Sequence, residues 1–195
     1  MKSDIILSGV GGQGIVSIAA VIGMAALENN LFIKQSEVHG MSQRGGAVQS
    51  HLRISETDIA SDLIPLGKAD LIISVEPMES LRYLPWLKED GWIVTNTTPF
   101  INIPDYPDLT ELLKEIEKIP HHIAINADEI ARQMKSPRSS NMVVLGAASH
   151  FVDVPYTSLE NGVKKIFERK GEKIVQLNLE AMKAGREFAE ANKHN

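Results

Sequence analysis

The stretch Asp4-Ile5-Ile6-Leu7-Ser8-Gly9-Val10-Gly11-Gly12-Gln13-Gly14 decides the fold of this 195-residue chain. An apolar strand ends in a glycine-dense turn, and a long helix rich in Ile, Val and Ala begins near Gln13. Glycine suits such a turn because it adopts positive φ and because the missing Cβ lets a ligand or another backbone come close. The amides at a helix start favour a negative group, typically a phosphate. The stretch therefore predicts a strand–loop–helix unit that holds a ligand or a neighbouring chain.

Length and composition indicate one ordinary globular domain, which we expect to span residues 1–195. The hydrophobic content of 43% and the charged content of 23% are typical of soluble proteins, and a formal charge of −5 gives no basic footprint for nucleic acid. The longest apolar run, residues 15–27, is too short to cross a bilayer, and the amino end does not resemble a signal peptide. We expect a cytoplasmic protein that binds neither nucleic acid nor membrane.

The sequence contains no cysteine. Iron–sulfur clusters are held mainly by thiolates, and structural zinc usually is too, so we expect no cluster on this chain. The sequence also shows no group of His and carboxylate residues at metal-ligand spacing and no nucleophile beside a base. We therefore predict no metal site and no catalytic residue. If the chain belongs to a redox enzyme, the electrons travel through another subunit.

Alternating apolar strands and helical patterns predict a three-layer α/β/α domain with a mostly parallel, mixed sheet. Residues 47–54 alternate apolar and polar side chains before a turn at 55–58, so we expect an inserted β-hairpin whose second arm is residues 59–60. Asp108, Asp128 and Asn141 are expected to cap helices. The other expected strands are 4–8, 32–38, 71–75, 91–95 and 123–126, and the expected helices are 13–30, 76–87, 108–118, 128–134, 142–151, 158–167 and 173–193.

A second informative stretch is His39-Gly40-Met41-Ser42-Gln43-Arg44-Gly45-Gly46, which has too many glycines to form a regular element. Arg44 beside Gly45 and Gly46 places a charged fork on backbone that a carboxylate or phosphate can approach closely. A surface loop with a solvated arginine is the alternative. We expect a loop that faces a partner or a substrate, formed by Glu37, His39, Ser42, Arg44, Gly45 and Gly46.

The glycine stretch admits other interpretations. Gly9, Gly11 and Gly14 satisfy a G-x-G-x-x-G pattern, and Glu37 lies about 20 residues further on, where an acid that binds a ribose would stand. The chain is then an independent dinucleotide-binding, Rossmann-like module. A tight turn without any ligand explains the glycines as well.

Three motifs taken together resemble the gamma-type domain of 2-oxoacid:ferredoxin oxidoreductases. They are residues 9–14, residues 36–46 with the sequence Ser-Glu-Val-His-Gly-Met-Ser-Gln-Arg-Gly-Gly, and residues 141–146 with the sequence Asn-Met-Val-Val-Leu-Gly. The second motif is most similar to the small (beta) subunit of the indolepyruvate branch of that family. The resemblance covers nearly the whole chain and implies a single domain of this type.

The resemblance implies coenzyme A-dependent oxidative decarboxylation of indolepyruvate or another aryl 2-oxoacid to an acyl-coenzyme A, carbon dioxide and reduced ferredoxin. Thiamine diphosphate, magnesium and the iron–sulfur clusters are then expected on the large (alpha) subunit, which also passes electrons to ferredoxin, so this chain alone is expected to be inactive. Coenzyme A is the cosubstrate that this chain could contact. The candidate cofactor-binding residues are Gly9, Gly11, Gly12, Gln13, Gly14 and Arg44, although the glycine loops could also meet only protein.

Overall fold

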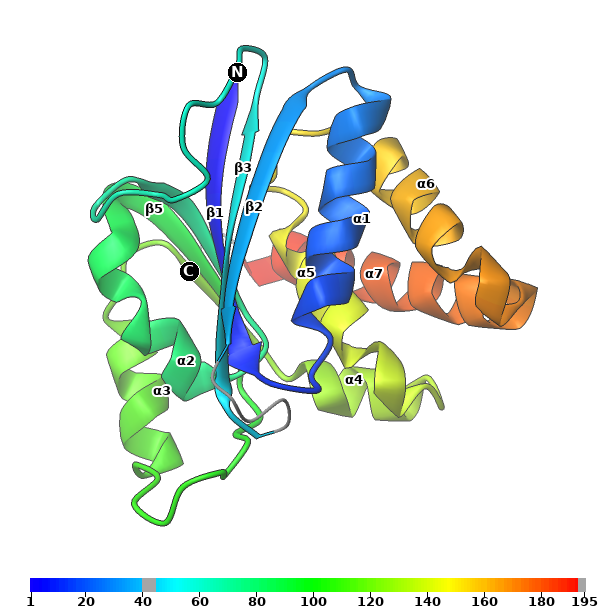
Figure 1. The fold of residues 1–195 in the computed structure, drawn as a ribbon. Coiled ribbons are helices and arrows are strands. Elements are labelled where there is room, and N and C mark those ends of the chain that lie inside the picture. The colour runs from blue at the N-terminus through cyan, green and yellow to red at the C-terminus, as the bar shows by residue number, and fades with distance from the viewer. Residues whose placement is uncertain (40–44, 193–195) are drawn as a thin grey trace.

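The computed structural model describes residues 1–39 and 45–192 and shows a six-stranded mixed sheet with helices on both faces (Figure 1). The strand order is β2-β3-β1-β4-β5-β6. Strands β1, β4, β5 and β6 run parallel, whereas β3 is antiparallel to both of its neighbours. The strands are β1 Lys2–Val10, β2 Phe32–His39, β3 Ala47–Ser55, β4 Ala69–Ser74, β5 Leu87–Asn96 and β6 His122–Ile125.

The helices divide unequally between the two faces, with α2 and α3 on one and the rest on the other (Figure 1). The α-helices are α1 Ile15–Glu28, α2 Pro77–Arg82, α3 Leu109–Glu117, α4 Ala127–Gln133, α5 Ser140–Ala148, α6 Tyr156–Phe167 and α7 Glu172–Asn192. Three short 3-10 turns are η1 Leu84–Trp86, η2 Pro137–Ser139 and η3 Glu168–Lys170.

The alternation of side chains along β1 produces two cores. Ile5 and Leu7 face the larger core, which they share with α1, α5, α6 and α7, while Ile6 faces a smaller core with Tyr83 of the α2 side. Successive side chains of a strand point to opposite faces, so an unbroken apolar run is needed where both faces are covered. The expected three-layer α/β/α architecture with a mostly parallel, mixed sheet is confirmed.

Two glycines allow the larger helical layer to pack closely where α5 crosses α7. A Cβ on Gly146 would lie 1.8 Å from the Met182 carbonyl oxygen, and a Cβ on Gly185 would lie 1.9 Å from the Val143 carbonyl oxygen. Each helix therefore offers a glycine to the backbone of the other. This contact packs α5, whose first turn carries Asn141 beside Gly14, closely against α7.

The antiparallel pair differs from the expected hairpin. Residues 59–60 form no strand, and β3 pairs instead with β2 over their whole lengths and with β1. The arms of the antiparallel pair are thus β2 and β3. The expectation was wrong because an alternating pattern identifies a strand but not the strand that it pairs with.

Several helix and strand boundaries also differ from those expected from the sequence. Asp108 caps α3 as expected, but Asn126 caps α4, so Asp128 lies in the first turn of that helix. The N-cap of α5 is Ser139, so Asn141 lies inside the helix and its side chain is free for other contacts. Strand β5 begins at Leu87, a residue that the sequence pattern assigned to the preceding helix.

Candidate functional site

The glycine loop joins the end of β1 to the start of α1, at the carboxyl edge of the parallel strands. Gly12 has φ +102° and Gly14 has φ +85°, a region of backbone conformation that favours glycine. Gly14 is the N-cap of α1, and no side chain caps the helix there. No side chain therefore competes with an anion for the helix start, although the Ser17 amide already donates to the Gly14 carbonyl at 3.1 Å.

The other loop residues hold the loop in place. Gln13 accepts a hydrogen bond from the Val10 amide at 2.7 Å and donates to the Val75 carbonyl at 3.3 Å, so its side chain clamps the ends of β1 and β4 together. Gly9 is buried, and a Cβ there would lie 2.4 Å from a methyl group of Val75. Gly9 thus serves close packing, and it lines neither of the two cavities that flank the loop.

The second glycine segment lies against the first. The Gly11 amide donates to the Gly46 carbonyl at 2.8 Å, and the Gly45 amide donates to the Gly11 carbonyl at 3.3 Å. Gly45 and Gly46, predicted from the second motif, are therefore in contact with the glycine loop. Ser42 and Arg44 lie outside the described residues, and of His39 only the backbone, at the end of β2, is described.

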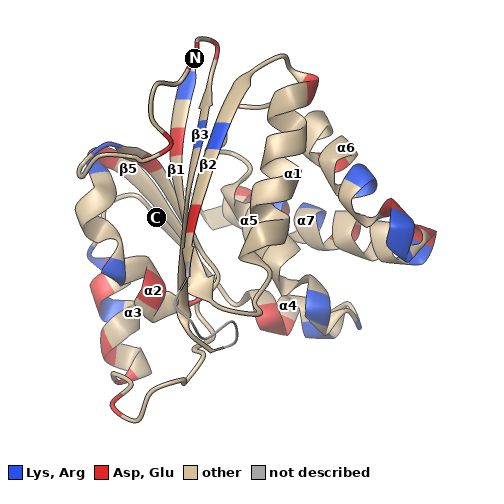
Figure 2. Ribbon diagram, in the orientation of Figure 1, with Lys and Arg blue, Asp and Glu red and all other residues tan. Residues whose placement is uncertain are grey.

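A basic cavity of about 560 Å³ opens on the α7 side of the glycine loop. Its lining includes Gly12, Gln13 and Gly14 from the loop and no Asp or Glu. Its charged lining residues are four cations: Lys135 and Arg138 from the segment that follows α4, Lys170 from η3 and Lys173 from the first turn of α7. Figure 2 shows basic residues at these ends of the helical layer, on the side away from α2 and α3.

The four cations have no acidic partner within the described part of the chain, although the Lys170 ammonium lies 5.2 Å from the centre of the Phe167 ring. Three buried polar side chains complete the wall: Asn141 donates to the Gly14 carbonyl at 3.1 Å, and Ser136 and Ser139 share a 2.8 Å hydrogen bond. No sequence pattern predicted this cationic wall, because basic residues so far apart in sequence resemble ordinary solvated residues. The wall suits a ligand with several negative charges.

An apolar cavity of about 340 Å³ opens on the other side of the same loop. Its single charged lining residue is Glu37, on edge strand β2, and its other lining residues are Val10, Gly11, Gly12, Gly14, Ile15, Val16 and Val48. Val16 is 58% exposed although it lies in the first turn of α1. The apolar cavity thus offers hydrophobic surface next to a carboxylate, a setting that disfavours phosphate.

The strand order does not favour the dinucleotide interpretation. In a dinucleotide-binding fold the acid stands at the end of the strand next to β1, but here β3 lies between β1 and the strand that carries Glu37. Two strand spacings, about 10 Å, therefore separate Glu37 from β1 within the sheet.

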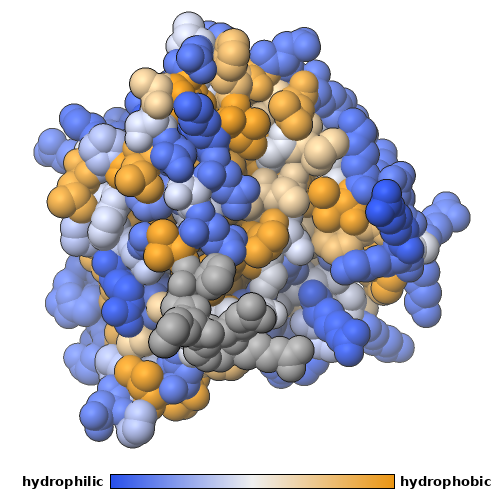
Figure 3. All heavy atoms as spheres, in the orientation of Figure 1, coloured by the Kyte–Doolittle hydropathy of each residue, from blue (hydrophilic) through white to orange (hydrophobic). Residues whose placement is uncertain are grey.

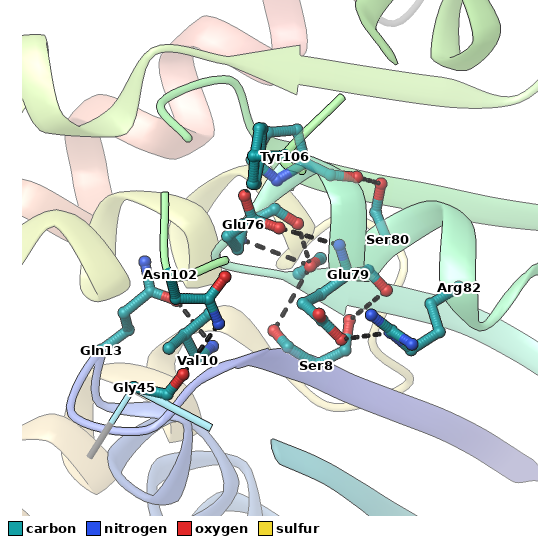
Figure 4. A network of polar contacts seen from close by, with 12 residues as sticks. Ser8, Val10, Gln13, Gly45, Glu76, Glu79, Ser80, Arg82, Asn102 and Tyr106 are labelled. Carbon is teal, nitrogen blue, oxygen red and sulfur yellow. Dashed lines mark hydrogen bonds and ion pairs between the residues drawn. The ribbon is translucent and has the colours of Figure 1, made fainter. Parts of the chain in front are cut away.

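A buried polar network lies under the site (Figure 4). Glu76, the fully buried N-cap of α2, accepts hydrogen bonds from the Glu79 amide at 2.8 Å, from the Phe100 amide at 3.2 Å and from the Tyr106 hydroxyl. Burial, together with the hydrogen bond to Glu76, raises the pKa of the Tyr106 hydroxyl, which therefore remains a donor. Burial also raises the pKa of the Glu79 carboxyl, despite its 3.0 Å contact with Arg82.

Within residues 1–39 and 45–192, no three His, Cys, Asp or Glu residues are grouped so that they could hold a metal ion. The same residues include no helix that is long and apolar enough to span a membrane.

Solved structures of similar fold include two that are under 25% identical. Pyruvate oxidoreductase subunit PORC of Thermotoga maritima matches with TM-score 0.73 and 22% identity over 95% of this chain and 96% of that chain. A 2-oxoglutarate:ferredoxin oxidoreductase of Magnetococcus marinus, solved with 2-oxoglutarate, coenzyme A and succinyl-CoA bound, matches with TM-score 0.75 and 24% identity. That match covers 97% of this chain but spans only 31% of the Magnetococcus chain.

Sequence relatives extend over almost the whole chain. Indolepyruvate oxidoreductase subunit IorB of Archaeoglobus fulgidus is 38% identical over 95% of this chain and 94% of its own length. Subunit IorB of Methanothermobacter thermautotrophicus is 35% identical over 95% of this chain and 96% of its own length. Residues 4–188 match the family described as pyruvate ferredoxin/flavodoxin oxidoreductase. The chain therefore belongs to the pyruvate ferredoxin/flavodoxin oxidoreductase family, which confirms the resemblance in its motifs.

Proposed function

We propose that this chain is the small subunit of a 2-oxoacid:ferredoxin oxidoreductase that oxidises indolepyruvate or a related aryl 2-oxoacid. The 38% identity to an indolepyruvate oxidoreductase subunit over nearly the full length of both chains carries the substrate assignment. The reaction is oxidative decarboxylation with coenzyme A, and ferredoxin receives the electrons through the large subunit. A cytoplasmic location is part of the same proposal.

The residues of this chain do not fit the redox cofactors of such an enzyme. A cluster needs thiolates, and the sequence has no cysteine. The proposal therefore assigns thiamine diphosphate, magnesium and the iron–sulfur clusters to the large subunit. This chain contributes no catalytic residue and acts by binding and positioning.

Coenzyme A does fit the basic cavity. Its phosphate groups carry several negative charges, and the cavity combines four cations and the uncapped start of α1 without any lining carboxylate. We assign the phosphates to the side of the glycine loop formed by Gly12 and Gly14, with Arg138 and Lys173 as the main cationic contacts. The backbone around Gly12 is open, since nothing lies within 4 Å of the position of a Cβ there.

The large subunit is assigned to the opposite side of the loop. The apolar cavity, with the exposed Val16 and with Glu37 on the edge strand, offers the mixture of hydrophobic surface and a single charge that protein interfaces use. Glu37, Gly45 and Gly46 then face the partner, as the second motif suggested.

Reconstitution from separately purified subunits tests the proposal. Ferredoxin reduction with indolepyruvate and coenzyme A is expected only after the two chains are mixed, and neither chain alone should show turnover. Arg138→Ala should raise the KM for coenzyme A about tenfold, because a charge-assisted hydrogen bond contributes about 1.5 kcal/mol or more. Arg169→Ala is the matched control, since Arg169 is exposed nearby on η3 but does not line the cavity. Turnover by this chain alone, or equal KM values in both variants, contradicts the proposal.

A further inference from the structure

The segment 97–107, which we call the strap, connects β5 to the N-cap of α3 and passes over the carboxyl edge of the sheet. Figure 1 shows it as the long loop at the lower edge of the molecule, and Figure 3 shows apolar groups on the surface in that region. It has no regular secondary structure. Its position is therefore determined by the contacts that its side chains and amides make.

A buried carboxylate anchors the strap at two points. Oε1 of Glu76 accepts from the Phe100 amide and from the Tyr106 hydroxyl. A fully buried carboxylate is tolerated only when it is hydrogen-bonded, so Glu76 and the strap stabilise each other. Glu76 also caps α2, but it does so through its other oxygen, Oε2. The cap therefore does not account for the two hydrogen bonds that Oε1 accepts from the strap.

Asn102 lies between the two anchor points and contacts the functional site. Its Nδ2 donates to the Gly45 carbonyl at 2.7 Å, and Gly45 and Gly46 are hydrogen-bonded to Gly11. The amide oxygen of Asn102 is buried and has no donor within the described residues. The bond from Nδ2 therefore links the strap to the second glycine segment.

We propose that the strap holds the Gly45–Gly46 segment on the glycine loop, with Asn102 as the positioning residue and with Glu76 and Tyr106 as its anchor. The hydrogen bonds form a closed circuit: Gly11 to Gly45, Gly45 to Asn102, the strap to Glu76, and the end of β4 through Gln13 back to β1. Loss of any link loosens the loop from the second glycine segment. The consequence for catalysis rests on the proposed function, but the positioning itself does not.

Residue-resolved amide hydrogen exchange of the full chain tests the positioning without any ligand. Asn102→Ala should raise the exchange rate of the Gly11 and Gly45 amides about five- to tenfold, the effect of one lost hydrogen bond. The melting temperature should stay near that of the wild type. Asp105→Ala is the matched control, because Asp105 is exposed on the same strap and its side chain makes no hydrogen bond to the described residues of the site. Exchange at Gly11 and Gly45 in this variant should equal that of the wild type.

Tyr106→Phe is the second variant, because it removes only the hydroxyl and keeps the ring. It should raise exchange at the same two amides, and the double variant with Asn102→Ala should exchange no faster than the faster single variant, since both act through the strap. Unchanged exchange at Gly11 and Gly45 in both single variants overturns the inference. Effects that simply multiply in the double variant overturn it as well.

The reconstituted enzyme provides the functional readout. Asn102→Ala should raise the KM for coenzyme A severalfold and leave kcat unchanged, whereas Asp105→Ala should change neither. Failure of the proposed function is recognised separately: Arg138→Ala then leaves the KM unchanged, while exchange at Gly11 still responds to Asn102→Ala. If Arg138→Ala raises the KM and Asn102→Ala changes neither exchange nor KM, the inference alone is overturned.

Discussion

The two cavities that flank the glycine loop share Gly12 and Gly14 but have opposite chemistry. The basic cavity, about 560 Å³, is lined by four cations and no carboxylate, whereas the apolar cavity, about 340 Å³, is lined mainly by valine, isoleucine and glycine and by one carboxylate. The cations come from the helical layer, and the apolar lining comes from β1, the start of α1 and the antiparallel strands. One loop can therefore serve an anion on one side and a protein on the other.

The difference also shows what the glycines do. Without side chains at Gly12 and Gly14, both cavities extend to the loop backbone. A side chain at either position would change both cavities at once. Substitutions of lining residues should instead affect each cavity alone, and this separation can be tested.

The largest expected effect is that of Gly14→Val, which disturbs both cavities. Gly14 has φ +85°, and a Cβ there would lie 2.5 Å from Nδ2 of Asn141. Backbone strain and overpacking together should lower the free energy of unfolding by about 3 kcal/mol, measured by urea denaturation. Gly12→Val is the control, because a Cβ at Gly12 meets open space and only the strain, about 1 to 2 kcal/mol, applies. Equal losses in the two variants would show that contact with Asn141 does not matter.

Charge reversal at the basic cavity should weaken coenzyme A binding without affecting assembly. The double variant Arg138→Glu with Lys173→Glu is expected to raise the KM for coenzyme A about 100-fold, since two charge-assisted contacts become repulsive. Affinity for the large subunit, measured by sedimentation, should remain that of the wild type. The corresponding reversal of Lys164, an exposed lysine of α6 outside the cavity, should leave the KM unchanged. A loss of assembly without a change in KM would place the large subunit, and not coenzyme A, at the basic cavity.

A charge in the apolar cavity should have the complementary effect. Val16→Asp is expected to weaken assembly with the large subunit about tenfold, because it introduces a carboxylate beside Glu37 at an apolar interface. The KM for coenzyme A, measured with enough large subunit to saturate the variant, should not change. Leu27→Asp on the same helix is the control, because Leu27 is 56% exposed and lies outside both cavities. Normal assembly of the Val16 variant argues against this surface as the interface.

Raising the ionic strength should weaken coenzyme A binding at the basic cavity more than assembly at the apolar cavity, with a smaller effect than the substitutions. Screening weakens attraction between exposed charges, so the KM for coenzyme A should rise severalfold as salt is increased. Assembly through the apolar cavity should respond much less. Parallel titrations with salt, one following KM and one following subunit association, compare the two directly, and equal salt dependence would contradict the assignment.

The smallest effect is expected from Glu37→Gln. If Glu37 does not bind a ribose, neither the wild type nor the variant should bind NAD in equilibrium titration, and unfolding free energy should change by less than about 0.5 kcal/mol. NAD binding by the wild type that disappears in Glu37→Gln would restore the dinucleotide interpretation.

Local sequence patterns predicted where strands and helices lie better than which strands pair with one another. The apolar runs of β1 and β4 and the glycine turn identify a buried parallel pair and the helix that follows, because burial on both faces requires such runs. The same reasoning cannot show that β3 pairs with β2 and β1, since pairing depends on contacts between distant segments. Asn126 and Asp128 are both good caps, and only the backbone conformation decides between them.

The candidate site was predictable only where it is continuous in sequence. The glycine loop is a single motif, residues 9–14. Its contact with Gly45 and Gly46 brings it together with the second motif, residues 36–46. The basic cavity combines Lys135 and Arg138 with Lys170 and Lys173, which the fold brings together from separate segments of the chain. Similarly, the strap depends on a contact between Glu76 and Tyr106, residues that carry no signal until β4 and the strap are adjacent.

The most direct test of the account is the structure of the assembled complex with coenzyme A bound. We predict that the phosphate groups lie in the basic cavity, within hydrogen-bond reach of the start of α1 and of the Arg138 guanidinium, and that the large subunit packs against Val16 and Glu37. Phosphates bound in the apolar cavity, or held entirely by the large subunit, would contradict it.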